Sequence, residues 1–188
     1  MTQDEASIPD PVDHLADRGA IPEAGRLGRL IDKGGIVFAV GLVVSALIII
    51  NEIVLRYVFN APTIWAHETT IFICGMSFIY GGLYCTARDQ HIRVVLIYDA
   101  LPPGGRRVLD VVISLVSAAA SGMFAWAAWL MVKRAAFMPD GTFRLERSGS
   151  AWDPVYPGLV KVGLFVILVV MALQFLVLTW NHARGVRR

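Results

Sequence analysis

The sequence predicts an all-α membrane protein with four transmembrane helices and short amphipathic segments at the membrane interface. Of its 188 residues, 56% are hydrophobic and only 17% are charged, and the mean hydropathy is +0.59, whereas a water-soluble domain of this size carries more charge. The apolar residues also gather in four runs without a charged side chain: Gly34–Asn51, Thr69–Ala87, Val111–Val132 and Val162–Ala183. Because about 20 helical residues cross a hydrocarbon core of about 30 Å, and lipid offers backbone groups no water, we expect each run to be one helix.

The first 24 residues are expected to form a disordered cytoplasmic tail, ahead of a membrane domain over residues 25–182. The tail is acidic, is broken by three prolines and has no apolar core of a signal peptide. The first membrane helix is therefore expected to direct the chain to the membrane. The segment AGRLGRLIDKGG, which precedes that helix, has two open interpretations: a short helix lying in the membrane interface, or a plain basic flank.

The first two membrane helices are predicted over residues 34–59 and 64–87. No helix breaker precedes Pro62, so the first helix is longer than the hydrocarbon core and must tilt or project from it. We expect Thr63 to be the N-cap of the second helix and Trp65 to lie at headgroup depth.

The last two helices are predicted over residues 108–133 and 156–181. The fourth has mostly bulky residues and is expected to face lipid or a partner protein. Its one strongly polar interior residue, Gln174, is interpreted as an interhelical hydrogen bond in preference to a transport site. The third helix has small residues at a spacing of four, which lets backbones approach closely in lipid: Ser114, Ala118 and Gly122 in one row, and Ser117, Ser121 and Ala125 in the next. The second helix offers Ser77/Gly81 and Gly82/Thr86 in the same way.

The connecting segments favour one orientation in the membrane. The apolar stretch at residues 92–97 is too short to span and is expected to lie in the membrane plane. With both termini inside, including residues 183–188, the cytoplasmic side holds 11 Lys and Arg residues and the other side 6. The positive-inside rule therefore places both termini in the cytoplasm, although Lys133 and Arg134 argue against this locally.

No motif for catalysis, metal binding or nucleic-acid binding is found in the sequence. It has no nucleotide-binding loop, zinc spacing or catalytic triad, so we expect a protein that is not an enzyme and holds no cofactor. A membrane anchor of a redox complex remains an alternative, because the chain has four histidines. Haem ligation, however, needs His on facing helix interiors, and all four lie in the tail or at helix ends: His14, His67, His91 and His182.

The charged residues gather at the helix ends instead of the middle of the membrane. A transporter that moves ions through its own core usually keeps ionisable residues or broken helices near the bilayer midplane, and the four runs have none. A self-sufficient small transporter is therefore the weaker alternative. The pattern favours an anchor or scaffold for a larger partner.

Four short motifs, in this order, resemble those of the small membrane subunit (DctQ-like small permease) of tripartite ATP-independent periplasmic (TRAP) transporters. They are N-E-x-x-x-R-Y-x-x-N from Asn51, W-x-x-E from Trp65, A-R-x-x-H-I-x-V from Ala87 and W-x-P from Trp152. The resemblance covers residues 30–180 and includes the size and the four-helix plan. The loop before Trp152 is longer and more charged than the family pattern.

The resemblance implies a multi-pass subunit of the bacterial inner membrane that binds a large membrane subunit. The large subunit is expected to carry the substrate and sodium sites, and a soluble periplasmic protein to deliver an organic anion such as a dicarboxylate, sialic acid or oxo acid. Glu52 and Arg56 are one helical turn apart and can pair. We hypothesise that these two residues and Glu68 hold the corner between the first two helices against the large subunit, and that Arg88 and His91 act similarly inside. Solvated charges and contacts with lipid headgroups are the alternatives. The residues expected at the subunit interface are Glu52, Arg56, Trp65, Glu68, Arg88 and His91.

Overall fold

The computed structural model describes residues 19–88, 102–138 and 140–184. These ranges form a short 3₁₀ turn, η1 (Pro22–Ala24), and four long helices: α2 (Gly25–Tyr57), α3 (Ala66–Ala87), α5 (Pro103–Ala136) and α6 (Tyr156–Arg184). All four helices are long and apolar enough to cross a membrane. The predicted all-α fold with four transmembrane helices is confirmed.

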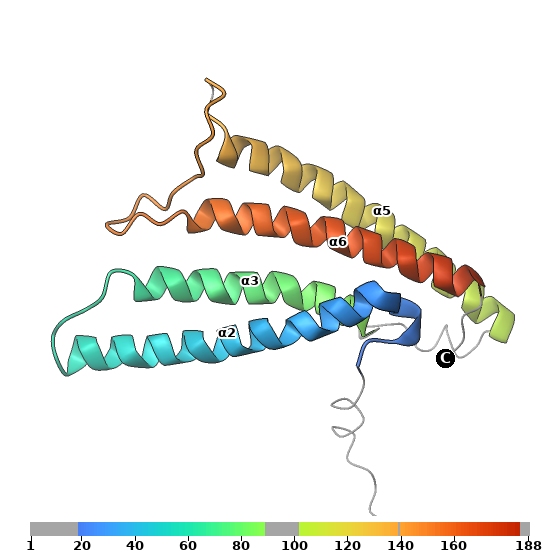
Figure 1. The fold of residues 1–188 in the computed structure, drawn as a ribbon, viewed down its shortest axis with the longest axis horizontal. Coiled ribbons are helices and arrows are strands. Elements are labelled where there is room, and N and C mark those ends of the chain that lie inside the picture. Colours follow the sequence, from blue (N-terminus) through green and yellow to red (C-terminus); the bar gives the residue numbers. More distant parts are fainter. Residues whose placement is uncertain (1–18, 89–101, 139, 185–188) are drawn as a thin grey trace, which may run out of the picture.

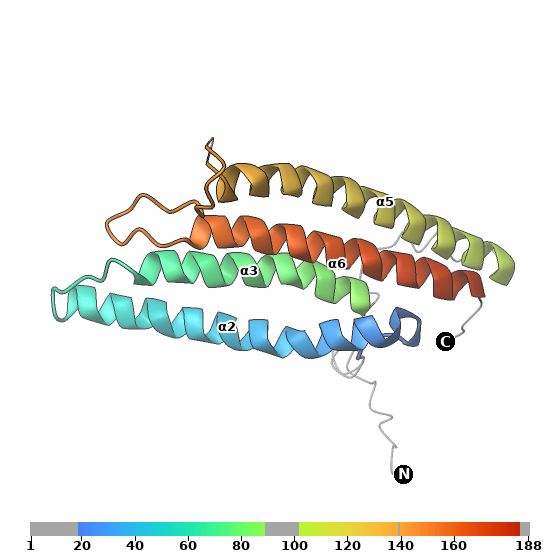
Figure 2. The ribbon, with the colours of Figure 1, turned by 45° about the horizontal axis from the view of Figure 1, so that its top comes forward.

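The four helices lie side by side in the order α2, α3, α6, α5 (Figures 1 and 2). The pairs α2–α3 and α6–α5 are antiparallel, whereas the two middle helices, α3 and α6, run parallel. Helix α6 packs against both α5 and α3, while α2 packs mainly on α3. The start of α2 and the end of α6 lie at one end of the molecule, and the α2–α3 corner lies at the other, together with residues 140–155 (Figure 1). Helix α6 lies between two other helices but keeps large exposed side chains, among them Leu173, Leu176 and Trp180, so the expectation that it faces lipid or a partner stays a prediction for that side.

The position of α6 follows from a narrow stripe of small side chains on α5. The stripe is almost fully buried and consists of Ser114, Ala118, Ser121, Ala125 and Ala128. Its spacing alternates between four and three residues, as the 3.6-residue period of a helix requires. Gly122 falls off the stripe and has no heavy atom within 4 Å of an added Cβ. The bulky residues of α6 thus meet small ones on α5, and the two predicted rows contribute jointly to one stripe.

The contact between α2 and α3 depends on glycines of α2. A Cβ at Gly35 would lie 2.5 Å from the Tyr84 ring, and one at Gly34 would overlap the Tyr80 hydroxyl. The Tyr80 ring is held in place, because it stacks on Phe38 with ring centroids 4.0 Å apart and its hydroxyl donates to the Ile31 carbonyl. The glycines expected to allow close approach from α3, Gly81 and Gly82, have open space instead.

The segment AGRLGRLIDKGG forms the first turns of α2, so there is no separate interfacial helix. Helix α2 begins at Gly25, nine residues before the predicted start. Ile31 is 4% exposed and packs in a core cluster with Leu83, Ala87 and Ile167. Ile31 and Leu27 therefore pack against α3 and α6, while Leu30 is exposed.

The residues just before α2 are anchored to the rest of the fold. The backbone N–H of Ile21 donates to the Ala87 carbonyl at 3.1 Å, and Asn181 Nδ2 donates to the Glu23 carbonyl at 2.7 Å. The fully buried Gln174 donates to the Ala24 carbonyl at 3.2 Å. The predicted disordered tail therefore does not extend to residues 21–24. Gln174 makes a hydrogen bond as predicted, but with the η1 turn and not with another membrane helix.

Candidate subunit interface

The corner between α2 and α3 is held by the carboxylate of Glu52. One oxygen accepts from Arg56, with Nη2 at 2.8 Å and Nε at 3.2 Å. The other accepts from the backbone N–H of Thr63 at 3.0 Å and from its hydroxyl. The Glu52 side chain is 10% exposed, whereas that of Arg56 is 54% exposed. The carboxylate thus joins the last turns of α2 to the loop that leads into α3, and the guanidinium keeps one side free for another contact.

The predicted role of Thr63 as a helix N-cap is wrong. Helix α3 begins at Ala66, after Trp65, and has no side-chain cap, because both Thr63 donors point back to Glu52. The turn reverses at Asn60, whose φ of 52° lies in the left-handed region, which Asn tolerates better than most residues. Pro62 then prevents the helix from continuing.

Glu68 and Trp65 do not join the Glu52–Arg56 pair. In the described ranges no hydrogen bond or ion pair links Glu68 to either residue, and its Oε2 atom is buried without a hydrogen-bond partner. Glu68 is one turn before Phe72 on α3, and Phe72 stacks on Tyr156 at the start of α6 with ring centroids 4.4 Å apart. A buried acceptor without a donor is costly, and the Glu68 side chain as a whole is only partly buried. Glu68 is therefore a candidate acceptor for a donor from another protein.

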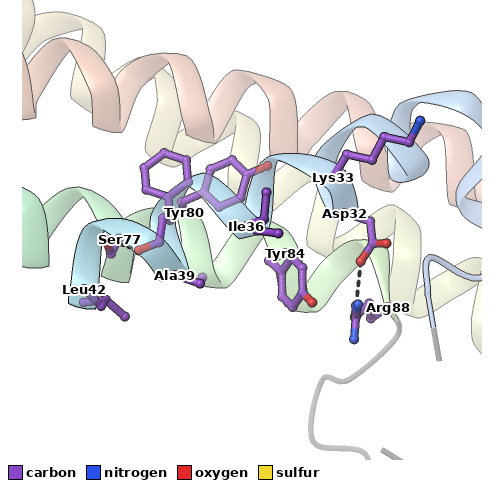
Figure 3. Close-up of a pocket in the computed structure, with 12 residues that line it drawn as sticks. Asp32, Lys33, Ile36, Ala39, Leu42, Ser77, Tyr80, Tyr84 and Arg88 are labelled. Atoms are coloured by element: carbon purple, nitrogen blue, oxygen red, sulfur yellow. Dashed lines mark hydrogen bonds and ion pairs between the residues drawn. The ribbon is translucent and has the colours of Figure 1, made fainter. Parts of the chain in front are cut away.

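A second ion pair holds α2 to α3 at the opposite end of the molecule. Arg88 Nε lies 2.6 Å from Asp32 Oδ1, and the side chains are 17% and 22% exposed (Figure 3). The guanidinium also lies over the Tyr84 ring, 4.6 Å from its centroid. Sequence reasoning chose Arg88 but missed Asp32, although Asp32 is the one acidic residue of the basic segment Arg26–Lys33. His91, the other residue predicted at this end, lies outside the described residues.

The long loop between α5 and α6 folds back onto the helix ends. The Glu146 N–H donates to the Ala135 carbonyl at 2.7 Å, and a Cβ at Gly158 would lie 3.1 Å from the Glu146 carbonyl oxygen. The loop borders an open pocket of about 500 Å³ that has three arginines among its lining residues: Arg134, Arg144 and Arg147. The contacts that the sequence left open are thus made with α5 and α6 of the same chain.

Asp153 organises the second half of this loop. Its Oδ1 accepts from the Gly149 N–H at 3.0 Å and its Oδ2 from Arg147 Nε at 2.6 Å. These two donors, the Gly149 N–H first, hold the pKa of the Asp153 carboxyl below its ordinary value. Next to it, Trp152 meets Tyr156 edge to face with ring centroids 5.5 Å apart, so the loop packs against the start of α6.

The described side chains show no arrangement for redox or metal chemistry. In residues 19–88, 102–138 and 140–184, no three His, Cys, Asp or Glu side chains could hold a metal ion. His67 lies at the start of α3 and His182 in the last turn of α6, at opposite ends of the molecule (Figure 1). These two histidines cannot ligate one haem. The groups that remain are ionic and hydrogen-bonding residues at the helix ends.

Comparison with known proteins identifies the family of the chain. A model of the family described as "Tripartite ATP-independent periplasmic transporters, DctQ component" matches residues 45–185, about three quarters of the chain. The chain belongs to this family. The match includes the Glu52 corner and Arg88, but it begins after Asp32. The resemblance stated from the sequence motifs is thereby confirmed.

A curated relative supports the same assignment over a shorter region. The ectoine TRAP transporter small permease protein TeaB of Halomonas elongata is 34% identical over 92 residues. This alignment covers 48% of the present chain and 48% of that protein, so the chain matches about half the length of the relative.

Proposed function

We propose that this member of the TRAP small-permease family is the scaffold subunit of a sodium-coupled secondary transporter. In this proposal it lies in the bacterial inner membrane with both termini in the cytoplasm. A periplasmic binding protein delivers an organic anion, and the large membrane subunit moves it. The family match over residues 45–185 is the observation that carries the proposal.

The arrangement of polar groups supports a scaffold more than a transport path. The charged residues of α2 stand at its two ends, on either side of the run Gly34–Asn51. The buried amide of Gln174 donates to the η1 turn. All four membrane helices are continuous, whereas transporter sites typically use broken helices at the midplane. The substrate path is therefore expected in the large subunit.

The contact with the large subunit is proposed at the Glu52 corner. Arg56 offers an exposed guanidinium beside a carboxylate that fixes its position. Glu68 offers a buried carboxylate oxygen that lacks a donor. In this proposal the large subunit supplies a hydrogen-bond donor to Glu68 and an acceptor to Arg56, so both groups gain a partner. Trp65 lies beside them, just before α3. Arg88 is held by Asp32, so in this proposal it supports the α2–α3 pair from the other end.

Assembly is tested by co-purifying the large subunit with variants of the full chain in mild detergent. Arg56→Gln and Glu68→Gln are expected to lower the yield of the large subunit, because each removes one charge; Glu68→Gln also keeps the side-chain shape. Lys133→Gln is the matched control, since Lys133 is also exposed and lies at the same end of the molecule. Wild-type yield with both glutamines would show that the interface lies elsewhere.

Coupling is tested with the complete three-component system in liposomes. Uptake should require a sodium gradient and proceed without ATP. Because the relative is named for ectoine, the substrate panel should contain ectoine beside dicarboxylates, sialic acid and oxo acids. Uptake driven by a proton gradient in the absence of sodium would contradict the coupling, and transport of none of the carboxylates would contradict the substrate class.

A further inference from the structure

A groove lies along the α2–α3 pair, with ionic groups at one end and apolar groups at the other (Figure 3). Its volume is about 720 Å³. Asp32, Lys33 and Arg88 form the ionic end, and the groove extends to Leu42 on α2 and Ser77 on α3. Its wall is mainly aliphatic and aromatic, with Ile36, Ala39 and Tyr80 among the lining residues. It is therefore amphipathic along its length.

The length of the groove matches one leaflet of a bilayer. From Asp32 to Leu42 the helix rises about 15 Å, at about 1.5 Å per residue. A hydrocarbon core of about 30 Å is twice that length. The ionic end lies directly before the uncharged run that starts at Gly34, so the groove begins at the membrane interface and ends near the midplane. A helix of a partner protein would cross the whole core, and a groove for it would be expected to continue past Leu42.

The ionic end has an excess of positive charge. Arg88 is paired with Asp32, and the ammonium of Lys33 points away from that pair (Figure 3). In the described part of the chain, no acidic side chain forms an ion pair with Lys33. The three groups together have a net charge of +1. Basic residues at this depth attract anionic lipid headgroups.

We propose that the groove binds a glycerophospholipid with an anionic headgroup. One acyl chain lies between α2 and α3 against Ile36, Ala39 and Leu42, and the phosphate lies at the ionic end near Lys33. The Asp32–Arg88 pair and the Phe38–Tyr80 stack form the fixed walls. Asp32 and Lys33 precede residue 45, where the family match begins, whereas Arg88 lies within the match.

Filling the groove tests the acyl-chain part of the proposal. Gly81 lines the groove, and an added Cβ there meets no atom within 4 Å, so Gly81→Leu should fold and occupy the space of about three methylene groups. We expect its affinity for phosphatidylglycerol to fall roughly 50-fold. Gly82→Leu is the matched control, since Gly82 is equally open but does not line the groove. The readout is native mass spectrometry of the full chain in mild detergent with added phosphatidylglycerol.

Headgroup selectivity tests the charged part. Phosphatidylglycerol should bind more tightly than diacylglycerol with the same chains. Lys33→Gln should reduce that preference by roughly two- to fivefold, as expected for an exposed ion pair. Arg29→Gln is the control, because Arg29 is exposed but does not line the groove.

Crosslinking of the unmodified chain gives a readout that does not depend on a variant. A phosphatidylglycerol with a diazirine in one acyl chain should label residues 36–42 and 77–84. Labelling spread over α5 and α6, equal effects of the two leucine variants, or equal binding of diacylglycerol would each overturn the proposal. It would also be overturned if the purified complex with the large subunit held no lipid at these residues and Gly81→Leu prevented assembly, since the large subunit would then fill the groove.

Discussion

Alanine in place of Gly34 should weaken the contact between α2 and α3 far more than the size of a methyl group suggests. The added Cβ would overlap the hydroxyl of Tyr80, and the ring cannot move without losing its other contacts. Those contacts are the stack on Phe38, at 4.0 Å between centroids, and the hydrogen bond to the Ile31 carbonyl.

The expected loss of stability is the sum of two lost contacts of the Tyr80 ring and one cost of repacking, less a gain in helix propensity. The hydrogen bond contributes about 1 kcal/mol and the aromatic pair about 1 kcal/mol, and repacking around the methyl group costs about 1–2 kcal/mol. Replacing Gly by Ala inside a helix returns about 1 kcal/mol. The expected net loss is about 2–3 kcal/mol in the free energy of unfolding.

The assay is unfolding of the purified chain by titration of SDS into mixed micelles, followed by circular dichroism. Gly82→Ala is the control, and it should be neutral or stabilising by up to about 1 kcal/mol, because its Cβ enters open space. Tyr80→Phe in the Gly34→Ala background should cost less than the sum of the two single changes, since the overlapping hydroxyl is gone. A Gly34→Ala chain as stable as the wild type, or strictly additive costs, would refute the close contact.

Three further predictions concern the ends of the helices. At the corner, Glu52→Ala should lower co-purification of the large subunit more than Arg56→Ala, because Glu52 also accepts hydrogen bonds from Thr63. For the same reason, the exchanged pair Glu52→Arg with Arg56→Glu should not restore co-purification. Recovery by the exchange would show that the two charges contact only each other. Orientation is tested in a chain whose Cys74 and Cys85 are replaced by serine. A cysteine introduced at Ser148 should react with an impermeant thiol reagent in intact spheroplasts. Labelling of a cysteine introduced at the C-terminus instead would reverse the topology. In the loop between α5 and α6, the lowered pKa of Asp153 means that its contribution to loop order is complete above its ordinary pKa of 3.8 and is lost as the pH falls through the lowered value. The tryptophan fluorescence of the chain, to which Trp152 contributes, should change below pH 3.8, and an unchanged acid profile in Asp153→Asn would contradict it.

The sequence predicts which segments cross the membrane, because lipid leaves a long apolar run no alternative to a helix. It does not predict which helix packs on which, since apolar side chains have no preference between lipid and one another. The central position of α6 illustrates this point, because it follows from the shape of the small-residue stripe on α5 and not from the composition of α6. Glycines were likewise expected to matter on α3, but the contacts use those of α2.

The candidate interface was predictable where its residues are close in sequence. Glu52 and Arg56 are one helical turn apart, and their pairing follows from helix geometry. The partners across larger separations were not predictable: Thr63 is 11 residues from Glu52, and Arg88 is 56 residues from Asp32. These contacts depend on the turn at Asn60 and on the close approach of α2 to α3, which only the structure defines.

Uptake of radiolabelled substrate into liposomes tests the scaffold role most directly. The chain reconstituted alone should give no uptake above protein-free liposomes under an inward sodium gradient, because its four helices provide no polar site at the midplane. Addition of the large subunit and the periplasmic binding protein should produce uptake, and the large subunit and binding protein without this chain should not. Substrate accumulation by the isolated chain would contradict the scaffold role.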